Sequence, residues 1–264
     1  MLGGAMGNFY DIALLPSEAP FMDADAYVVV DVLRATTTIA VLFEGGLADL
    51  VVAESVELAL EIARREGRLL FGEVGGVPPA GFDHGNSPME AADLDVKGRG
   101  GVLYTTNGTR ALCALAPVGV VVTGALANLD VVVEFLSGQE RGVVVCAGEQ
   151  GGKRFAQEDF AAAGVILQMA IKEAPGSDLG DAAGIAVSAP GMEDWLASGI
   201  QRSGRSGRLI GSAQHARDLF ALGLGADVQF ATQENISGAL PTVVEWGAGW
   251  ARLMDVRAAG GGMA

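Results

Sequence analysis

Short apolar runs alternate along this chain with longer stretches of helical pattern. The runs at residues 27–30, 69–72 and 143–145 are continuously apolar, which is typical of strands that are buried on both faces of a sheet. The patterns between them, such as residues 56–66, place apolar side chains on one helical face. Strands separated by helices predict an α/β fold with three layers (α/β/α) around a mostly parallel central sheet, with mixed pairing left open.

One domain is expected to occupy residues 1–264, because no linker divides the chain cleanly. Residues 174–211 interrupt the alternation and predict a helical insertion or cap with a mobile loop, and residues 258–264 predict a disordered tail. The other predicted helices are at 36–44, 107–114, 129–136, 159–173 and 212–222, the last being the final helix. The other predicted strands are at 49–52, 102–104, 118–122 and 228–231.

The charge balance argues against several classes of function. A net charge of −15 leaves no basic footprint for nucleic acid or for an anionic membrane surface. No apolar run reaches the roughly 18 residues of a membrane span, and the first residues lack the basic start of a signal peptide. The two cysteines, Cys113 and Cys146, make a disulfide framework unexpected, so we predict a cytoplasmic protein.

Polar residues gather where four of the predicted strands end. Asp31 and Arg34 follow the strand at 27–30, and Glu73 follows the strand at 69–72. A third cluster occupies residues 105–109 and a fourth occupies residues 148–159. Ligands of open α/β sheets bind outside the carboxyl ends of the strands, so we expect the four clusters to form one site.

The segment TTNGT joins a predicted strand to a predicted helix and is suited to binding phosphate. Its backbone N–H groups and hydroxyls can point at an oxyanion, and Gly108 permits close approach. The alternative is an ordinary turn and helix cap, where Thr and Asn are common. In the loop DHGNSP, Asn86 and Ser87 can also bind substrate, although both residue types are frequent in turns.

Carboxylates at the ends of elements can bind a cation. Asp31 can bind Mg²⁺ or attack phosphorus, and Arg34 can bind a phosphate oxygen through its planar guanidinium, unless the two form a plain salt bridge. Glu158 and Asp159 begin a helix, where acidic residues commonly offset the helix dipole. As metal ligands they join Asp31 and Glu73 in an oxygen site suited to Mg²⁺, which needs only one or two carboxylates.

Several phosphatase mechanisms do not fit the spacing of the residues. Cys146 is too far from Arg154 for the five-residue loop of a cysteine phosphatase, and residues 31–33 lack the D-x-D of haloacid dehalogenases. His84 and His215 are too far apart to form a local zinc or histidine-phosphatase motif. The phosphate-binding signature of nucleotide-triphosphate P-loops is also missing from the sequence.

Taken together, the motifs resemble one family. The segments VVVDVLRATTTI, GEVGG, GFDHGNSP, YTTNGTRAL and CAGEQGGKRFAQEDFAAAGVI have the order and spacing of the 2-phosphosulfolactate phosphatases, and the resemblance covers residues 11–241. It implies a Mg²⁺-dependent enzyme with an α/β/α architecture. The implied reaction is hydrolysis of 2-phospho-3-sulfolactate to 3-sulfolactate and phosphate, a step in coenzyme M biosynthesis.

Carried over position by position, the resemblance implies a set of site residues. The implied catalytic residues are Asp31, Arg34 and Asp159. The implied Mg²⁺ ligands are Asp31, Glu73, Glu158 and Asp159. The implied substrate-binding residues are Asn86, Ser87, Thr105, Thr106, Asn107, Gly108, Thr109, Lys153 and Arg154. The loop GEQGGKRF after Cys146 departs from the shorter, more hydroxyl-rich loop of the family, which leaves the roles of Lys153 and Arg154 open.

The partner implied by these residues is a small polyanionic phosphate ester. Two alternatives stay open: a phosphatase of the same fold that acts on another phosphorylated hydroxy acid, and a non-catalytic anion-binding protein. A homodimer is also compatible with the sequence. Because the chain is acidic, a polyanionic substrate requires a locally positive site. The candidates for that charge are Arg34, Arg110, Lys153, Arg154 and the basic stretch at 202–208.

Overall fold

The computed structural model describes residues 7–188 and 206–258 of the chain. The strands are β1 (Phe9–Ala13), β2 (Ala26–Val30), β3 (Asp49–Ala53), β4 (Leu69–Gly72), β5 (Gly100–Tyr104), β6 (Val120–Gly124), β7 (Arg141–Cys146), β8 (Asp178–Leu179), β9 (Pro241–Gly247) and β10 (Trp250–Asp255). The helices are α1 (Ala35–Glu44), α2 (Val56–Glu66), α3 (Pro88–Ala92), α4 (Gly108–Leu115), α5 (Leu129–Ser137), α6 (Gln157–Glu173), α7 (Asp181–Ser188), α9 (Ser206–Gly211), α10 (Gln214–Ala221) and α11 (Gly225–Phe230).

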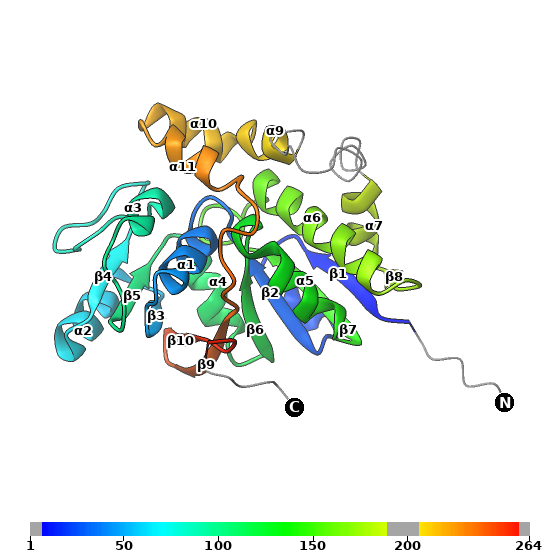
Figure 1. Ribbon diagram of the computed structural model, residues 1–264, viewed down its shortest axis with the longest axis horizontal. Helices are drawn as coiled ribbons and strands as arrows, with labels where there is room; N and C mark the ends of the chain where they lie inside the picture. Colours follow the sequence, from blue (N-terminus) through cyan, green and yellow to red (C-terminus); the bar gives the residue numbers. More distant parts are fainter. Residues whose placement is uncertain (1–6, 189–205, 259–264) are drawn as a thin grey trace.

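The strands of the described ranges form one ten-stranded sheet. Its order is β4-β5-β3-β10-β9-β6-β2-β7-β1-β8, and every pair is parallel except those made by β9 and β10. Helices flank the sheet (Figure 1). The predicted α/β fold with a mostly parallel sheet is therefore confirmed, and the two C-terminal strands make the sheet mixed.

Strand β2 shows why the sheet is so apolar. Its residues Ala26, Val28 and Val30 belong to the core that contains α5 and α6. Tyr27 and Val29 belong to the opposite core, which contains α1 and α4. Since each residue is at most 3 % exposed, both faces of the strand are buried and its sequence shows no period-two alternation.

Helix α2 forms over the range predicted for it, because its ends carry local signals. The Ser55 hydroxyl accepts a hydrogen bond from the backbone N–H of Leu58 at 3.2 Å, which caps the first turn. Gly67 ends the helix in the left-handed region, with φ of 64°. Between these ends, Ile62 and Ala63 pack against β3, β4 and β5.

The prediction of a strand at residues 228–231 is wrong, because the first three of these residues belong to α11. An apolar run of four residues is too short to distinguish the two-residue repeat of a strand from the 3.6-residue repeat of a helix, so tertiary packing decides between them. In α11 the residues Asp227 and Val228 are buried, as a helix placed over the core requires. The helix predicted at 212–222 forms as α10 but is not the final helix, since α11 follows it.

The hairpin of β9 and β10 was not predicted, nor was β1. β10 pairs with β3, and β9 pairs with β6 through Val122 and Thr242, so the hairpin occupies the middle of the sheet. The strands that pair with this hairpin are distant from it in sequence, so the residues around the hairpin do not indicate its position in the sheet.

The predicted insertion at 174–211 is only partly described. β8 pairs with β1 at one edge of the sheet, and α7 and α9 pack against α6. The mobile loop predicted in this region and the first residues of the basic stretch fall on 189–205, and the predicted tail falls on 259–264 apart from Ala258; these residues lie outside the described ranges. Across residues 7–188 and 206–258, no helix has the length and apolar character that a transmembrane segment requires.

Candidate active site

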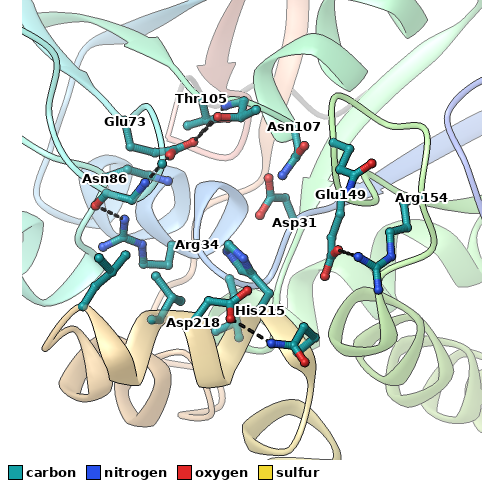
Figure 2. A pocket seen from close by; sticks show the side chains of 18 residues that line it. Asp31, Arg34, Glu73, Asn86, Thr105, Asn107, Glu149, Arg154, His215 and Asp218 are labelled. Atoms are coloured by element: carbon teal, nitrogen blue, oxygen red, sulfur yellow. Dashed lines mark hydrogen bonds and ion pairs between the residues drawn. The ribbon is translucent and has the colours of Figure 1, made fainter.

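A cavity of about 380 Å³ lies at the carboxyl ends of β2, β4, β5 and β7, and α10 covers its other side (Figures 1 and 2). The four polar clusters predicted from the sequence therefore meet in one place. The predicted residues that line the cavity are Asp31, Arg34, Glu73, Asn86, Thr105, Thr106, Asn107 and Arg154. The predicted residues that do not line it are Ser87, Gly108, Thr109, Lys153, Glu158 and Asp159.

Asp31 is a buried carboxylate at the end of β2, and its side chain is directed into the cavity (Figure 2). Burial raises its pKa, and nearby Glu73 raises it further; the charge of His215 and the backbone N–H groups of Ala35 and Gly108 lower it. Within the described residues Asp31 has no ion pair, so it does not form the plain salt bridge with Arg34 that was considered as an alternative.

Gly108 explains how closely the next loop approaches this carboxylate. A Cβ atom on Gly108 would lie 2.6 Å from an oxygen of Asp31 and 2.8 Å from the Cβ of Ala35. Glycine is therefore required where the first turn of α4 meets Asp31. The sequence predicted close approach to a ligand at this position, whereas the observed neighbour is a side chain of the protein.

Behind Asp31, two further acidic residues begin α6. Asp159 accepts hydrogen bonds from the backbone N–H of Val32 and of Gly148, both at 3.1 Å, and so joins the ends of β2 and β7. Burial raises the pKa of Asp159 well above its usual range, and the charges of Asp31 and Glu158 add to the shift. Burial also raises the pKa of Glu158, and one of its oxygens is buried without a hydrogen-bond partner among the described residues.

Glu73, by contrast, is fully hydrogen-bonded. One carboxylate oxygen accepts the backbone N–H of Gly76 at 2.8 Å. The other accepts the backbone N–H and the hydroxyl of Thr106, both at 2.9 Å. Glu73 therefore has less capacity left for a metal ion than Asp31 has, and it holds two loops of the cavity together.

The TTNGT loop uses most of its own donors internally. The backbone N–H of Thr105 donates to the Thr109 hydroxyl at 3.0 Å, and the backbone N–H of Thr109 donates to the Thr105 hydroxyl at 3.2 Å. With the Thr106 N–H bound to Glu73 and the Gly108 N–H bound to Asp31, four of the five loop amides have protein acceptors. The geometry therefore agrees with the turn-and-cap alternative, and leaves little of the loop to bind a phosphate directly.

Asn86 and Ser87, which lie in one loop, have different roles in the structure. Ser87 caps α3 by accepting the Glu90 N–H at 3.1 Å, and its hydroxyl donates to Asp227 at 2.5 Å. Asn86 is 3 % exposed and lines the cavity, yet its amide oxygen has no partner within the described residues. Leaving such a buried atom unpaired costs about 1–3 kcal/mol, so it is expected to pair with a buried water or with a ligand.

The basic residues are distributed over two neighbouring cavities. Arg154 lines the main cavity and pairs with Glu149 at 3.5 Å. Arg110 and Lys153 line a second cavity of about 640 Å³ instead. A hydrogen bond of 2.9 Å from the Gly151 N–H to the Asn107 amide oxygen lies between the two cavities. The expected cluster of positive charge around one ligand is thus split.

Several functional candidates were missed in the sequence. His215 and Asp218 extend from α10 toward Asp31 and Arg34 across the cavity (Figure 2). Asp227, on α11, accepts a hydrogen bond from Arg34 at 2.6 Å. The only signal for these three residues in the sequence is that each is a polar residue in a helix. Such a pattern does not show which helix lies over a site.

The oxygen donors of the site suit Mg²⁺ better than a soft metal. The carboxylate of Asp31, the unpartnered oxygen of Glu158 and the unpartnered amide oxygen of Asn86 are all hard ligands. Within the described ranges no three His, Cys, Asp or Glu side chains converge into a complete metal site. Mg²⁺ tolerates this, since it usually takes one or two carboxylates and completes its shell with water and phosphate.

Comparison with known proteins gives a consistent result. The profile of the family described as 2-phosphosulpholactate phosphatase matches residues 14–245. A protein of Thermotoga petrophila named "Probable 2-phosphosulfolactate phosphatase" is 35% identical over 234 residues, which cover 89% of this chain and 95% of the relative. A protein of Deinococcus radiodurans with the same name is 38% identical over 226 residues, covering 83% of this chain and 88% of the relative. The chain belongs to the 2-phosphosulfolactate phosphatase family.

Proposed function

We propose that this protein hydrolyses a small phosphate monoester with the help of Mg²⁺, and that the substrate is 2-phospho-3-sulfolactate, as in coenzyme M biosynthesis. The observation that carries the proposal is the meeting of Asp31, Arg34 and Asn86 in one cavity of a chain from this family. A cavity of about 380 Å³ suits a small molecule.

The charge of the cavity supports a role for a cation. Four carboxylates line it, from Asp31, Glu73, Glu149 and Asp218, against the two guanidinium groups of Arg34 and Arg154. Both guanidinium groups are already paired with acidic residues. A phosphate dianion would meet net repulsion there, so the proposal needs an additional positive charge.

Each residue then has a stated part in the proposed reaction. Asp31 would hold the Mg²⁺ ion, whose charge would neutralise the phosphoryl oxygens. Arg34 would bind a phosphate oxygen through the donors that its protein partners leave free. Asp159 would keep the ends of β2 and β7 in place, so that Asp31 faces the substrate.

A panel of phosphate esters tests this proposal. We expect phosphate release from 2-phospho-3-sulfolactate in Mg²⁺, none in excess chelator, and full recovery when Mg²⁺ is restored. Phosphorylated hydroxy acids without the sulfonate should react more slowly, and neutral alkyl phosphates more slowly still. Added salt should weaken this preference, because screening limits the reach of surface charge to about 8 Å at physiological ionic strength.

The panel also identifies the alternatives. A faster reaction with another phosphorylated hydroxy acid would reassign the substrate and keep the reaction. Equal turnover of neutral and polyanionic esters would indicate a phosphatase without charge selectivity. Full activity in chelator would end the Mg²⁺ proposal, and binding of phosphate esters without any turnover would indicate an anion-binding protein.

A further inference from the structure

An acidic residue of helix α11 contacts Arg34, which lines the active-site cavity. Asp227 on α11 is 3 % exposed, and one of its oxygens accepts a hydrogen bond from Arg34 at 2.6 Å. Its other oxygen accepts the Ser87 hydroxyl at 2.5 Å. One carboxylate therefore joins three segments: the start of α1, the start of α3 and the C-terminal helix α11.

Arg34 continues this network toward the opposite wall. Its second terminal nitrogen donates to the carbonyl oxygen of Gly76 at 2.9 Å. The N–H of Gly76 donates to Glu73, which in turn binds Thr106. A continuous chain of hydrogen bonds thus runs from Asp227 to the TTNGT loop and passes through the one buried guanidinium group that lines the cavity among the described residues.

Stability alone is a weak explanation for a buried pair of this kind. The cost of removing both charges from water offsets much of the attraction between them, and apolar replacements of such pairs are often neutral or stabilising. What the pair does supply is geometry. A guanidinium group has five N–H donors in one plane, so two fixed contacts at its terminal nitrogens fix the direction of the others.

We propose that Asp227 is a positioning residue, which holds the guanidinium of Arg34 in the orientation that the phosphoryl group requires. This inference rests on the proposed phosphatase activity. Asp227 also cancels part of the charge of Arg34, which by itself would weaken the attraction for an anion. A positioning role therefore predicts that removal of the Asp227 charge lowers kcat without raising KM.

The test is Asp227→Asn, assayed with an ester that the wild-type protein hydrolyses in Mg²⁺. Asn replaces one of the two acceptor oxygens with an NH₂ donor and removes the negative charge, so it cannot reproduce the charged pair with Arg34 and the hydrogen bond accepted from the Ser87 hydroxyl as they stand. We expect kcat to fall at least tenfold and by up to about 10²-fold, the scale reached when a catalytic group is displaced by about 1 Å. KM should stay level or fall, because the charge of Arg34 is no longer partly cancelled by its acidic partner.

The matched control is Asp49→Asn. Asp49 pairs with Arg68 at 2.8 Å, has a side chain that is 18% exposed, and lies at the start of β3, at the end of the strand away from the cavity. This variant, like Asp227→Asn, removes the charge of an aspartate that is paired with an arginine, but it does so away from the cavity. The kcat should therefore stay within about twofold of wild type, an ordinary effect of a substitution distant from the site. Circular dichroism confirms that each variant is folded.

Several outcomes overturn the inference. These are an Asp227→Asn kcat within about threefold of wild type, a raised KM at unchanged kcat, or an equal loss of kcat in Asp49→Asn. If Asp227→Asn does not fold, Asp227→Glu decides the question: it keeps the charge and both acceptor oxygens but moves the carboxylate by one methylene group, so an unchanged kcat in that variant ends the proposal. A wild-type protein that hydrolyses no ester would refute the phosphatase proposal itself, and this inference with it.

Discussion

Carboxylates near the amino ends of the parallel strands differ from those near the carboxyl ends in their ion pairs and in the direction of their pKa shifts. At the amino ends, Asp49 and Glu66 both accept hydrogen bonds from Arg68, at 2.8 and 2.6 Å. The hydrogen bond from Arg65, followed by that from Arg68, lowers the pKa of Glu66. At the carboxyl ends, Asp31 and Asp159 are buried without an ion pair in the described part of the chain, and burial raises the pKa of each.

The difference shows which carboxylates lower the stability of the folded protein: those at the carboxyl ends of the strands. Carboxylates next to arginines are stabilised as anions, whereas carboxylates buried without a cation are destabilised in that form. A sequence under no other constraint would not retain the second arrangement, and perturbed groups of this kind cluster at functional sites. The cation proposed above would supply the positive charge that the carboxyl ends lack, whereas the carboxylates at the amino ends already pair with Arg68.

Replacing Asp31 should have the largest effect of the changes that test this comparison. Asp31→Asn keeps the shape and removes the charge, so the rate should fall by about 10² or more, as when one key electrostatic group is lost. The melting temperature should not fall, because a buried uncompensated charge is removed. Steady-state kinetics and thermal denaturation measure the two effects. A fall of less than threefold would reduce Asp31 to a structural residue.

Asp49→Asn should show the reverse pattern at the other end of the strands. Loss of the hydrogen bond from Arg68 should lower the free energy of unfolding by about 1 kcal/mol, as expected for a partly exposed charged pair. The rate should be almost unchanged. Urea denaturation at neutral pH measures the loss, and a variant as stable as wild type would remove the contrast between the two ends.

The cysteines should give the smallest effects. Burial raises the pKa of Cys113 to about 12, and Cys146 is fully buried at the end of β7. Both thiols should resist maleimide at pH 8 in the native protein and react after unfolding. An unfolded thiol loses its proton at about pH 8.5. Since the folded Cys113 keeps its proton longer, the stability that it contributes is complete below that pH and declines as the pH rises toward 12.

Replacing both cysteines with Ala should leave substantial turnover, because neither lines the main cavity. Loss of turnover in a folded Cys146→Ala variant would instead point to a thiol mechanism at the carboxyl ends. Rapid labelling of the native protein at pH 8 would contradict the burial of the thiols.

Sequence reasoning succeeded where the determinants were local. Ser55 and Gly67 set the limits of α2, and Asp31 directly follows an apolar strand, so its place at the carboxyl end followed from the parallel sheet. It could not find His215 or Asp227, because only tertiary packing brings α10 to the cavity and α11 to Arg34. Arg34 was correctly placed at the cavity, but its partner is 193 residues away.

The position of the β9–β10 hairpin also limits how the protein is made. Three of the described strands lie on one side of the hairpin and five on the other, all within the first 180 residues. In the described ranges these two parts of the sheet are joined only through β10, which pairs with β3, and β9, which pairs with β6. A ribosome delivers β9 and β10 after the other eight described strands. Until β9 and β10 have been synthesised, each of the two parts of the sheet has an unpaired inner edge. Such edges pair readily with other chains.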